Sequence, residues 1–591
     1  MFGTVPHRFA VAVCFALATS ASGAQSLSRA SDSILRNTFE APDAGPYNDH
    51  DAARFLAQAT FGPTLTDIQD LRQKGYQGWF DEQVDAQLTP PTHAMDYINW
   101  LNSIASTDYY YGRIESWWLG ALGGPDPANF NVIHKDQLRQ RVAFALSQIF
   151  VTSDKSFALS GQPYGLSSYY DVLTDDAFSN FRTLLQDVTL SPAMGVYLSM
   201  LGNQKPDPVK NIRPDENYAR EVMQLFSVGL VQLNLDGTPV LVNGQQVPTY
   251  DQNTVKGFAH VFTGWTYPTC DAQSWSWCTV LTPSTPDGWI SPMVPVESYH
   301  DSANSKQLLV YPGVALPGGI LPAGGDAQGD LNAALDNIFY HPNVGPFISK
   351  QLIQRLVTSN PTQAYVARVA SVFNDNGSGV RGDLKAVVKA ILFDQEARWG
   401  QWTMPSTFGK LREPLIRITH LWRTLGARHY CGTGDELNPY RYIEWFPDME
   451  FGQAALRSPS VFNFYYPDFA PPGEVLDAGL VAPEMQLNTD AWITSMMNGL
   501  QARLFYRIAG IGCNAGTGYV MIDPAAEAVY AADPKALIDR YDLLFMSGQM
   551  SPLMRTTLIN YLATIPASSA TQRVKYALFL ILTSPEYVIQ Q

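Results

Sequence analysis

Apolar residues recur every three or four positions along most of the chain, which is the spacing of an amphipathic helix. The pattern is clearest over residues 136–151 and 384–393, where leucine, valine and isoleucine side chains fall on one helical face. Similar patterns predict further helices over residues 51–60, 66–74, 78–84, 178–187, 217–228, 331–339, 346–357, 362–373, 414–425, 490–508, 534–544, 551–563 and 570–581. Helices therefore account for most of the predicted structure.

The alternating pattern of a β-strand is sparse. Residues 231–247 alternate around Asp236-Gly237 and Asn243-Gly244, dipeptides typical of tight turns, so we predict a small hairpin there. Residues 266–330 form an irregular insertion of about 65 residues, rich in Pro and Gly, with short strands expected near residues 307–310. We expect a mainly α-helical fold, with one large multi-helix domain over residues 51–591 that carries the hairpin and the insertion.

The first 24 residues have the features of a cleaved secretory signal peptide. A basic start at His7 and Arg8 is followed by an apolar run over residues 9–18, which is too short to span a membrane. Small residues before Gln25 favour cleavage at that position, and residues 25–50 form a flexible leader. We expect a periplasmic or secreted protein, and no later segment has the pattern of a transmembrane anchor.

Composition agrees with a folded protein. Of 591 residues, 46% are hydrophobic and 16% are charged, which is typical of a chain with a large core. The net charge of −15 argues against nucleic acid as a partner, because a phosphate backbone requires a basic surface. The aromatic content of 12% has two explanations: a thick core, or a surface that stacks on sugar rings or other flat ligands.

Four cysteines remain once the signal peptide, with Cys14, is removed. Because an even number in an exported chain suggests disulfides, we pair Cys270 with Cys278 across a short loop. Cys431 and Cys513 then pair by elimination. Zinc binding is the competing interpretation, and it is weak because the chain has no CxxC spacing.

The helix predicted over residues 217–228 carries a polar stripe. Steps of about 100° place Asn217, Arg220, Glu221 and Gln224 on one side of an otherwise apolar helix. One interpretation is an ordinary solvated face or a structural ion pair. The other is a polar cluster facing a cleft, with Glu221 as general base or metal ligand and Arg220 holding an anionic group.

His300 and Asp301 lie in the irregular insertion and are followed by Lys306. A histidine on a loop can serve as an acid, a base or a metal ligand, although a loop-stabilising hydrogen bond is the simpler role. The remaining helical histidines, including His260 and His420, are expected to pack in the core.

A second group of charges precedes the helix that begins at Pro414. Lys410 and Arg412 could bind a carboxylate, phosphate or sulfate near the helix start, and Glu413 there suits the helix dipole. The simpler interpretation is structural, with Pro414 at the first helical turn.

The stretch Pro214-Asp-Glu-Asn-Tyr-Ala-Arg-Glu-Val-Met-Gln-Leu-Phe-Ser-Val-Gly229 resembles the central signature of the bacterial family known as domain of unknown function 1800. His300-Asp301 with Lys306 also matches that family. Further ordered matches are residues 54–62, 141–148, 191–195, 262–265, 341–343, 351–360, 381–383, 410–414, 457–465 and 584–587. The resemblance implies an exported helical bacterial protein, often encoded beside a second exported family that looks like sulfatases. It implies no active site.

Two classes of function follow. The first is an exported binding or scaffold protein, which the absence of a nucleophile elbow, a P-loop or a metalloprotease motif favours, and which acts with a sulfatase-like exported partner. The second is a periplasmic or secreted enzyme, metal-dependent or not, that acts on a polymer or an anionic small molecule. The sequence assigns no cofactor or metal. If Glu221, Arg220, His300, Asp301 and Lys410 lie within about 10 Å of one another around a pocket, the enzyme is favoured. If they are scattered in separate buried ion pairs, the scaffold is favoured.

Overall fold

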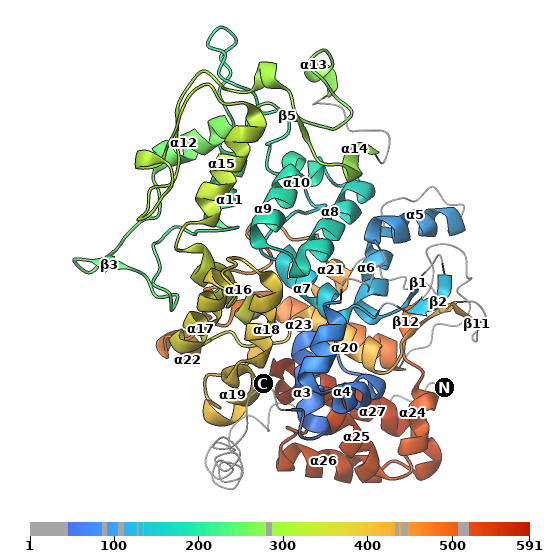
Figure 1. Ribbon diagram of the computed structural model, residues 1–591. Helices are drawn as coiled ribbons and strands as arrows, with labels where there is room; N and C mark the ends of the chain where they lie inside the picture. The colour runs from blue at the N-terminus through green and yellow to red at the C-terminus, as the bar shows by residue number, and fades with distance from the viewer. Residues whose placement is uncertain are drawn as a thin grey trace.

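A computed structural model describes residues 45–85, 92–104, 112–126, 129–133, 135–278, 287–431, 436–438, 447–505 and 519–591. Helices dominate these residues, which confirms the expectation of a mainly α-helical fold (Figure 1). Across the described ranges, no helix combines the length and the apolar character needed to cross a membrane.

The longer helices are distributed along the whole described chain. In the first half they are α3 (Asp49–Ala59), α4 (Leu65–Gln83), α5 (His93–Ile104), α6 (Gly112–Leu122), α7 (Gln137–Ser147), α8 (Pro163–Asp175), α9 (Phe181–Leu190), α10 (Pro192–Tyr197), α11 (Asn217–Gln224) and α12 (Gln252–Val261). In the second half they are α15 (Ala327–Phe339), α16 (Val344–Leu356), α17 (Gln363–Asn374), α18 (Leu384–Phe393), α19 (Gln395–Thr403), α20 (Pro414–Thr424), α23 (Asp490–Phe505), α25 (Pro534–Met546), α26 (Pro552–Ala563) and α27 (Ala570–Leu582).

Local chemistry fixes where these helices begin and bend. The side chain of Asp383 accepts a hydrogen bond from the backbone N–H of Ala386, which caps α18 at the predicted position. Within α4, Gly75 has a φ of 72° and interrupts the helical backbone. The two helices predicted on either side of this glycine therefore form one bent element.

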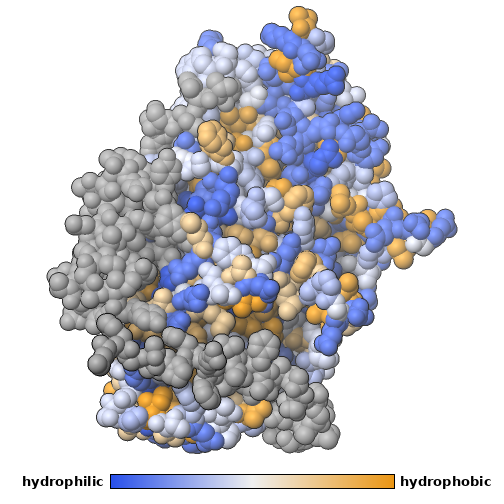
Figure 2. All heavy atoms as spheres, turned by 180° about the vertical axis from the view of Figure 1, so that it is seen from behind, coloured by the Kyte–Doolittle hydropathy of each residue, from blue (hydrophilic) through white to orange (hydrophobic). Residues whose placement is uncertain are grey.

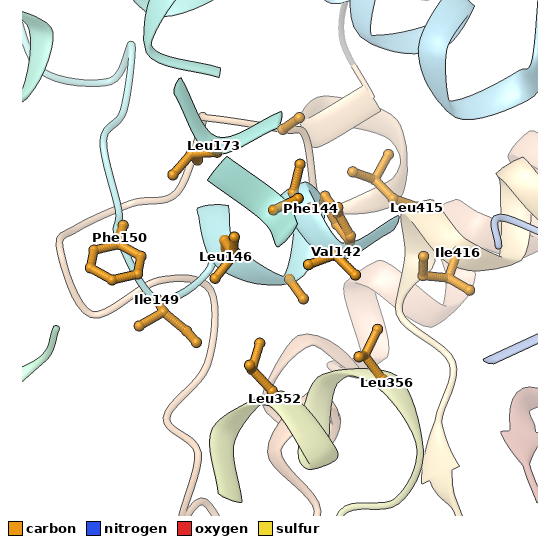
Figure 3. Packing of buried hydrophobic residues seen from close by; sticks show 14 of the residues in the cluster. Val142, Phe144, Leu146, Ile149, Phe150, Leu173, Leu352, Leu356, Leu415 and Ile416 are labelled. Atoms are coloured by element: carbon orange, nitrogen blue, oxygen red, sulfur yellow. The ribbon is translucent and has the colours of Figure 1, made fainter. Parts of the chain in front are cut away.

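A large buried core joins helices from distant parts of the sequence. Figure 3 shows side chains of α7, such as Val142 and Leu146, between Leu352 of α16 and Leu415 of α20. These four side chains expose 1% of their surface or less. Because full burial of such side chains stabilises a fold by roughly 1.5–3 kcal/mol each, α7 is a central support of the molecule.

The helices form two groups, one towards each end of the molecule, with further helices between them. In Figure 1, α11, α12 and α15 lie towards the top, whereas α3, α4 and α25–α27 lie towards the bottom. The helices α7 and α20 lie between these ends. The face shown in Figure 2 mixes hydrophilic and hydrophobic residues rather than presenting one apolar side.

The strands are short and form small antiparallel sheets. Leu241–Val242 (β3) pairs with Gln245–Gln246 (β4) around Asn243-Gly244, so the predicted hairpin is confirmed. This hairpin projects from the body in Figure 1. The other strands are β1 (Pro125–Asp126), β2 (Asn129–Ile133), β5 (Trp265–Thr266), β6 (Val294–Pro295), β7 (Lys306–Gln307), β8 (Ile320–Leu321), β9 (Lys410–Leu411), β10 (Arg428–Cys431), β11 (Glu436–Asn438), β12 (Tyr519–Met521) and β13 (Ile589–Gln590).

Among its described residues, the segment predicted as an irregular insertion contains short elements before α15 begins at Ala327. They include α13 (Trp275–Cys278), α14 (Asp287–Ile290) and the strand pairs β5–β6 and β7–β8. Cys270 and Cys278 form a disulfide, as predicted. The predicted partners Cys431 and Cys513 cannot be compared, because the side chain of Cys431 and all of Cys513 lie outside the described part of the chain.

Candidate functional site

The polar stripe of α11 divides between surface and interior. Arg220 is 40% exposed and forms an ion pair of 3.1 Å with Glu216, whereas Glu221 is buried. Asn217 begins the helix, and its backbone N–H donates to Asp215 Oδ1 at 2.8 Å. Burial raises the pKa of the Glu221 carboxyl, and the charge of Arg220 only partly opposes that rise. Glu221 is therefore the chemically unusual group of this helix.

His300 and Lys306 both contact the carboxylate of Asp330, which was not among the predicted site residues. His300 Nε2 lies 3.1 Å from Asp330 Oδ2, and Lys306 Nζ lies 2.6 Å from the same oxygen. Burial acts to raise the pKa of Asp330, but hydrogen bonds and charge from His300 and Lys306 hold it below its ordinary value. The group links the insertion to α15, which carries Asp330.

Asp301 contacts a different histidine, His260. Its carboxylate hydrogen-bonds His260 Nδ1 and accepts two bonds of 3.0 Å from the Asn304 side chain. Burial acts to raise the pKa of Asp301, but these hydrogen bonds outweigh it and hold the pKa at about 2. The expectation that His260 only packs in the core is therefore wrong, because its ring joins α12 to the insertion.

These two histidine groups have the properties of structural supports. His300 is fully buried, and its Nδ1 lies 3.0 Å from the carbonyl oxygen of Thr263. Both ring nitrogens of His300 thus have acceptors nearby, which leaves neither free for a ligand. Across the described ranges, no group of three or more His, Cys, Asp and Glu side chains is placed to hold a metal ion.

Lys410 and Glu413 belong to a second, separate network. Lys410 Nζ lies 2.9 Å from Glu484 Oε1 and 3.7 Å from Glu413 Oε1, and all three residues are buried. Glu484 lies on a short 3-10 helix, η4 (Pro483–Leu487). Burial raises the pKa of Glu484, and the charge of Lys410 only partly opposes it. One cation is therefore shared by two buried carboxylates.

Two further cations lie beside this network. Arg141 and Arg355 are buried, and Arg141 Nη2 donates to the Arg355 carbonyl oxygen at 2.7 Å. Burial lowers the pKa of Arg141, and Glu413 partly opposes that effect. Arg412, by contrast, hydrogen-bonds the Tyr587 carbonyl oxygen and stacks over its ring. Lys410 and Arg412 therefore do not share the anion site that their spacing suggested.

Gln148 connects the buried charges to the surface. Its side-chain amide contacts Glu413, and its Oε1 accepts a bond of 3.2 Å from the Tyr465 hydroxyl. The same side chain lines a shallow depression, which we call the Gln148 hollow. The other lining residues are Phe144, Ser147, Thr152, Ala454, Ala455, Leu456, Ser458, Asn463 and Phe464.

The Gln148 hollow is small and uncharged. Its space, counted together with open solvent at the mouth, is about 220 Å³, and its enclosed part has room for about one water molecule. Two buried polar atoms of its lining, Thr152 Oγ1 and Asn463 Nδ2, have no hydrogen-bond partner. Both atoms are shielded from solvent, and leaving them unpaired costs free energy.

The backbone of the hollow is strained. Leu456 has a φ of 54° and Asn463 a φ of 64°, a region that bulky residues such as leucine rarely adopt. Hydrogen bonds from neighbouring residues hold the loop: Asp154 N–H donates to the Leu456 carbonyl at 3.0 Å, and Ser153 Oγ donates to that of Ser458 at 2.6 Å. Strain that the surroundings enforce in this way is a recurrent property of functional sites.

Exposed apolar side chains adjoin the lining residues along the chain. Phe157 is 97% exposed and Met449 is 69% exposed, and an ion pair between Lys155 and Asp448 holds their two segments together at 2.7 Å. Phe462 and Tyr466 flank the lining residues 463 and 464, with their ring centroids 5.5 Å apart.

The hollow was not predicted from the sequence. Of the predicted site residues, Glu413 contacts Gln148, and none of them lines the hollow. One feature of the sequence could have indicated the hollow. The segments 141–148 and 457–465, which resemble family signatures, are uncharged except for an arginine at the start of each. Residues 141–152 and 454–464 are far apart in sequence, so only the fold brings them together.

The predicted site residues thus lie in separate groups. Among the described residues, no hydrogen bond or ion pair joins Glu221 to the group of His300, or either of them to Lys410.

No curated protein and no solved structure matches the chain. A family model described as a protein of unknown function, DUF1800, matches residues 54–589, which is nearly the entire sequence. The chain therefore belongs to the DUF1800 family.

Proposed function

We propose that this protein is an exported binding protein that docks a partner protein over the Gln148 hollow. The observation that carries the proposal is the exposure of two apolar side chains, Phe157 and Phe462, in the two chain segments whose residues line the uncharged hollow. A partner could place one polar group in the hollow while its apolar side chains cover Phe157 and Phe462. This combination is typical of the energetically important centre of an interface.

The distribution of charge supports a protein partner over a charged small molecule. No residue lining the hollow carries a charge. Asp154 and Arg457, which neighbour lining residues in the sequence, are already paired: Asp154 binds Arg457 at 3.0 Å and Arg113 at 2.7 Å. An anionic ligand would therefore find no free cation among these residues, whereas an apolar surface with a few polar groups would be complementary.

Export is part of the same proposal. The signal peptide is a prediction from residues 1–24, and the disulfide between Cys270 and Cys278 fits an oxidising compartment. The resemblance to the family suggests a sulfatase-like exported protein as the first partner to test.

Site-directed photocrosslinking in the native producer tests the proposal. A photoreactive amino acid would replace Phe157 or Phe462, and the control would carry it at Val380, which is 43% exposed on another part of the surface. We expect the first two positions to crosslink the same single protein and Val380 to crosslink none. Loss of that crosslink in an Asn463→Ala variant would show that the contact with the partner depends on the hollow.

Two results would contradict the proposal. Equal crosslinking from all three positions would indicate non-specific contact. Turnover of a polymer or an anionic small molecule by the purified mature protein, abolished by Asn463→Ala, would replace the binding role with the enzyme alternative.

A further inference from the structure

The loop of residues 205–213, which we call the Val209 loop, holds an apolar side chain out in solvent. Asp207 and Ile212 exchange two backbone hydrogen bonds, of 3.1 and 2.9 Å, that close the loop. Asp207 Oδ1 also accepts from the backbone N–H groups of Val209 and Lys210, at 3.0 and 3.1 Å. Val209 is nevertheless 96% exposed. Because these hydrogen bonds already fix the backbone, binding through this side chain would cost little conformational entropy.

The disulfide loop carries a second exposed apolar side chain at the same end of the molecule. Trp277 of α13 is 56% exposed and lies within the loop that the disulfide closes. Trp275 stacks on Tyr299, with the ring centroids 4.1 Å apart. The Tyr299 carbonyl oxygen accepts from the Lys205 backbone N–H at 2.8 Å, which connects α13 to the Val209 loop. Figure 1 shows α13 and the teal Val209 loop together at the top of the molecule.

Positive charge accompanies these apolar side chains, although the chain as a whole is acidic. The Val209 loop contains three cations, Lys205, Lys210 and Arg213, and one anion, Asp207. Asp207 pairs with Lys210 at 3.2 Å, whereas Lys205 and Arg213 form no ion pair within the described part of the chain. The disulfide loop adds a single anion, Asp271. The two loops together therefore have a net positive charge.

We propose that this end of the molecule is a contact surface for an anionic phospholipid bilayer. Val209 and Trp277 enter the interfacial layer, where apolar and indole side chains are favoured. Lys205 and Arg213 lie at the level of the lipid phosphates, and each strengthens binding about fivefold. The net charge of −15 repels the rest of the surface from such a bilayer, which confines the contact to this end.

The separation of the two apolar side chains favours lipid over a protein partner. Val209 and Trp277 protrude from two different loops, joined through buried Trp275 and half-buried Tyr299. A folded partner requires a continuous complementary surface, whereas a fluid lipid interface accommodates separate protruding side chains. Vesicle binding requires no partner protein at the Gln148 hollow, so either proposal can fail without the other.

Co-sedimentation of the mature protein with vesicles tests this surface. One set of vesicles contains equal parts of phosphatidylcholine and phosphatidylglycerol, and the other contains phosphatidylcholine alone. We expect binding to the anionic vesicles at least tenfold stronger than to the neutral ones at 50 mM salt, and loss of that difference at 500 mM salt.

Two matched pairs of variants locate the contact. Val209→Asp should weaken binding to the anionic vesicles at least tenfold, whereas Val529→Asp should leave it unchanged, since Val529 is 74% exposed in another part of the chain, on η5 (Ala528–Tyr530). The double variant Lys205→Gln/Arg213→Gln should weaken binding about 25-fold, whereas Lys535→Gln, at a side chain that is 67% exposed, should not. All variants should melt like the parent, because the substituted side chains lie at the surface.

Three results would overturn the proposal. The first is equal binding to both kinds of vesicle, or binding to neither. The second is an equal effect of Val209→Asp and Val529→Asp, which would indicate general charge repulsion. The third is a photocrosslink from position 209 to a protein in the absence of any vesicle binding, which would assign this surface to a protein partner.

Discussion

Gln453 donates a hydrogen bond of 2.6 Å to Glu413 Oε2, the same oxygen that the Gln148 amide contacts. Gln148 also lines the hollow proposed as the docking site. The position of this lining side chain thus depends on a buried carboxylate, which in turn depends on Lys410. Disturbing the buried charges is expected to disturb the hollow.

Replacing Lys410 with Met tests the importance of this buried cation. Glu413 and Glu484 would lose their shared positive charge while remaining buried, so we expect the free energy of unfolding to fall by about 3–5 kcal/mol. Urea unfolding of the mature protein measures the change. Lys74→Met is the control, since Lys74 pairs with Asp70 at the surface at 2.7 Å and should change stability by less than about 1 kcal/mol. A similarly small loss of stability in both variants would show that the contacts of Lys410 with Glu413 and Glu484 contribute little to the fold.

Asp171 should make stability fall as the pH rises. The carboxylate of this half-buried residue accepts from the backbone N–H groups of His93 and Ala94, and loss of hydration raises its pKa to about 8 from an ordinary 3.8. A raised pKa gives stability that is complete below pH 4 and is lost as the pH rises towards 8, by up to about 1.4 kcal/mol per pH unit. Urea unfolding at pH 5, 6.5 and 8 should show a steeper decline for the parent than for Asp171→Asn. Parallel profiles would contradict this assignment.

Asp301 should have the opposite dependence. Because its pKa is held at about 2, below the ordinary 3.8, its contribution is complete above pH 4 and is lost as the pH falls towards 2. We expect Asp301→Asn to be less stable than the parent by about 1–2 kcal/mol at pH 6, with the difference shrinking in acid. A difference that does not change with pH would assign the effect to packing rather than to the His260 contact.

The Cys270–Cys278 disulfide should be intact in exported protein. Closing a loop with a sequence separation of 8 residues is expected to stabilise the fold by about 2–3 kcal/mol. Mass spectrometry of alkylated peptides, with and without reduction, measures the linkage, and thermal unfolding of a Cys270→Ser/Cys278→Ser variant measures its effect. Free thiols at both positions in protein from the native compartment would remove this support for export.

The sequence predicted the fold better than the site. Apolar spacing was sufficient to predict α18, because helix formation depends on residues within one or two turns. The contacts of His300 were not predictable, since its partner Asp330 lies 30 residues away on another element. The strain at Leu456 likewise accompanies a tertiary contact, its carbonyl accepting from Asp154 N–H, which no local pattern encodes.

Hydrogen–deuterium exchange of the mature protein with its crosslinked partner tests the docking proposal most directly. The account predicts slower exchange in residues 152–160 and 447–466, which form and adjoin the Gln148 hollow, and unchanged exchange in the hairpin at residues 231–248. Protection confined to the hairpin, or absent from residues 447–466, would contradict it.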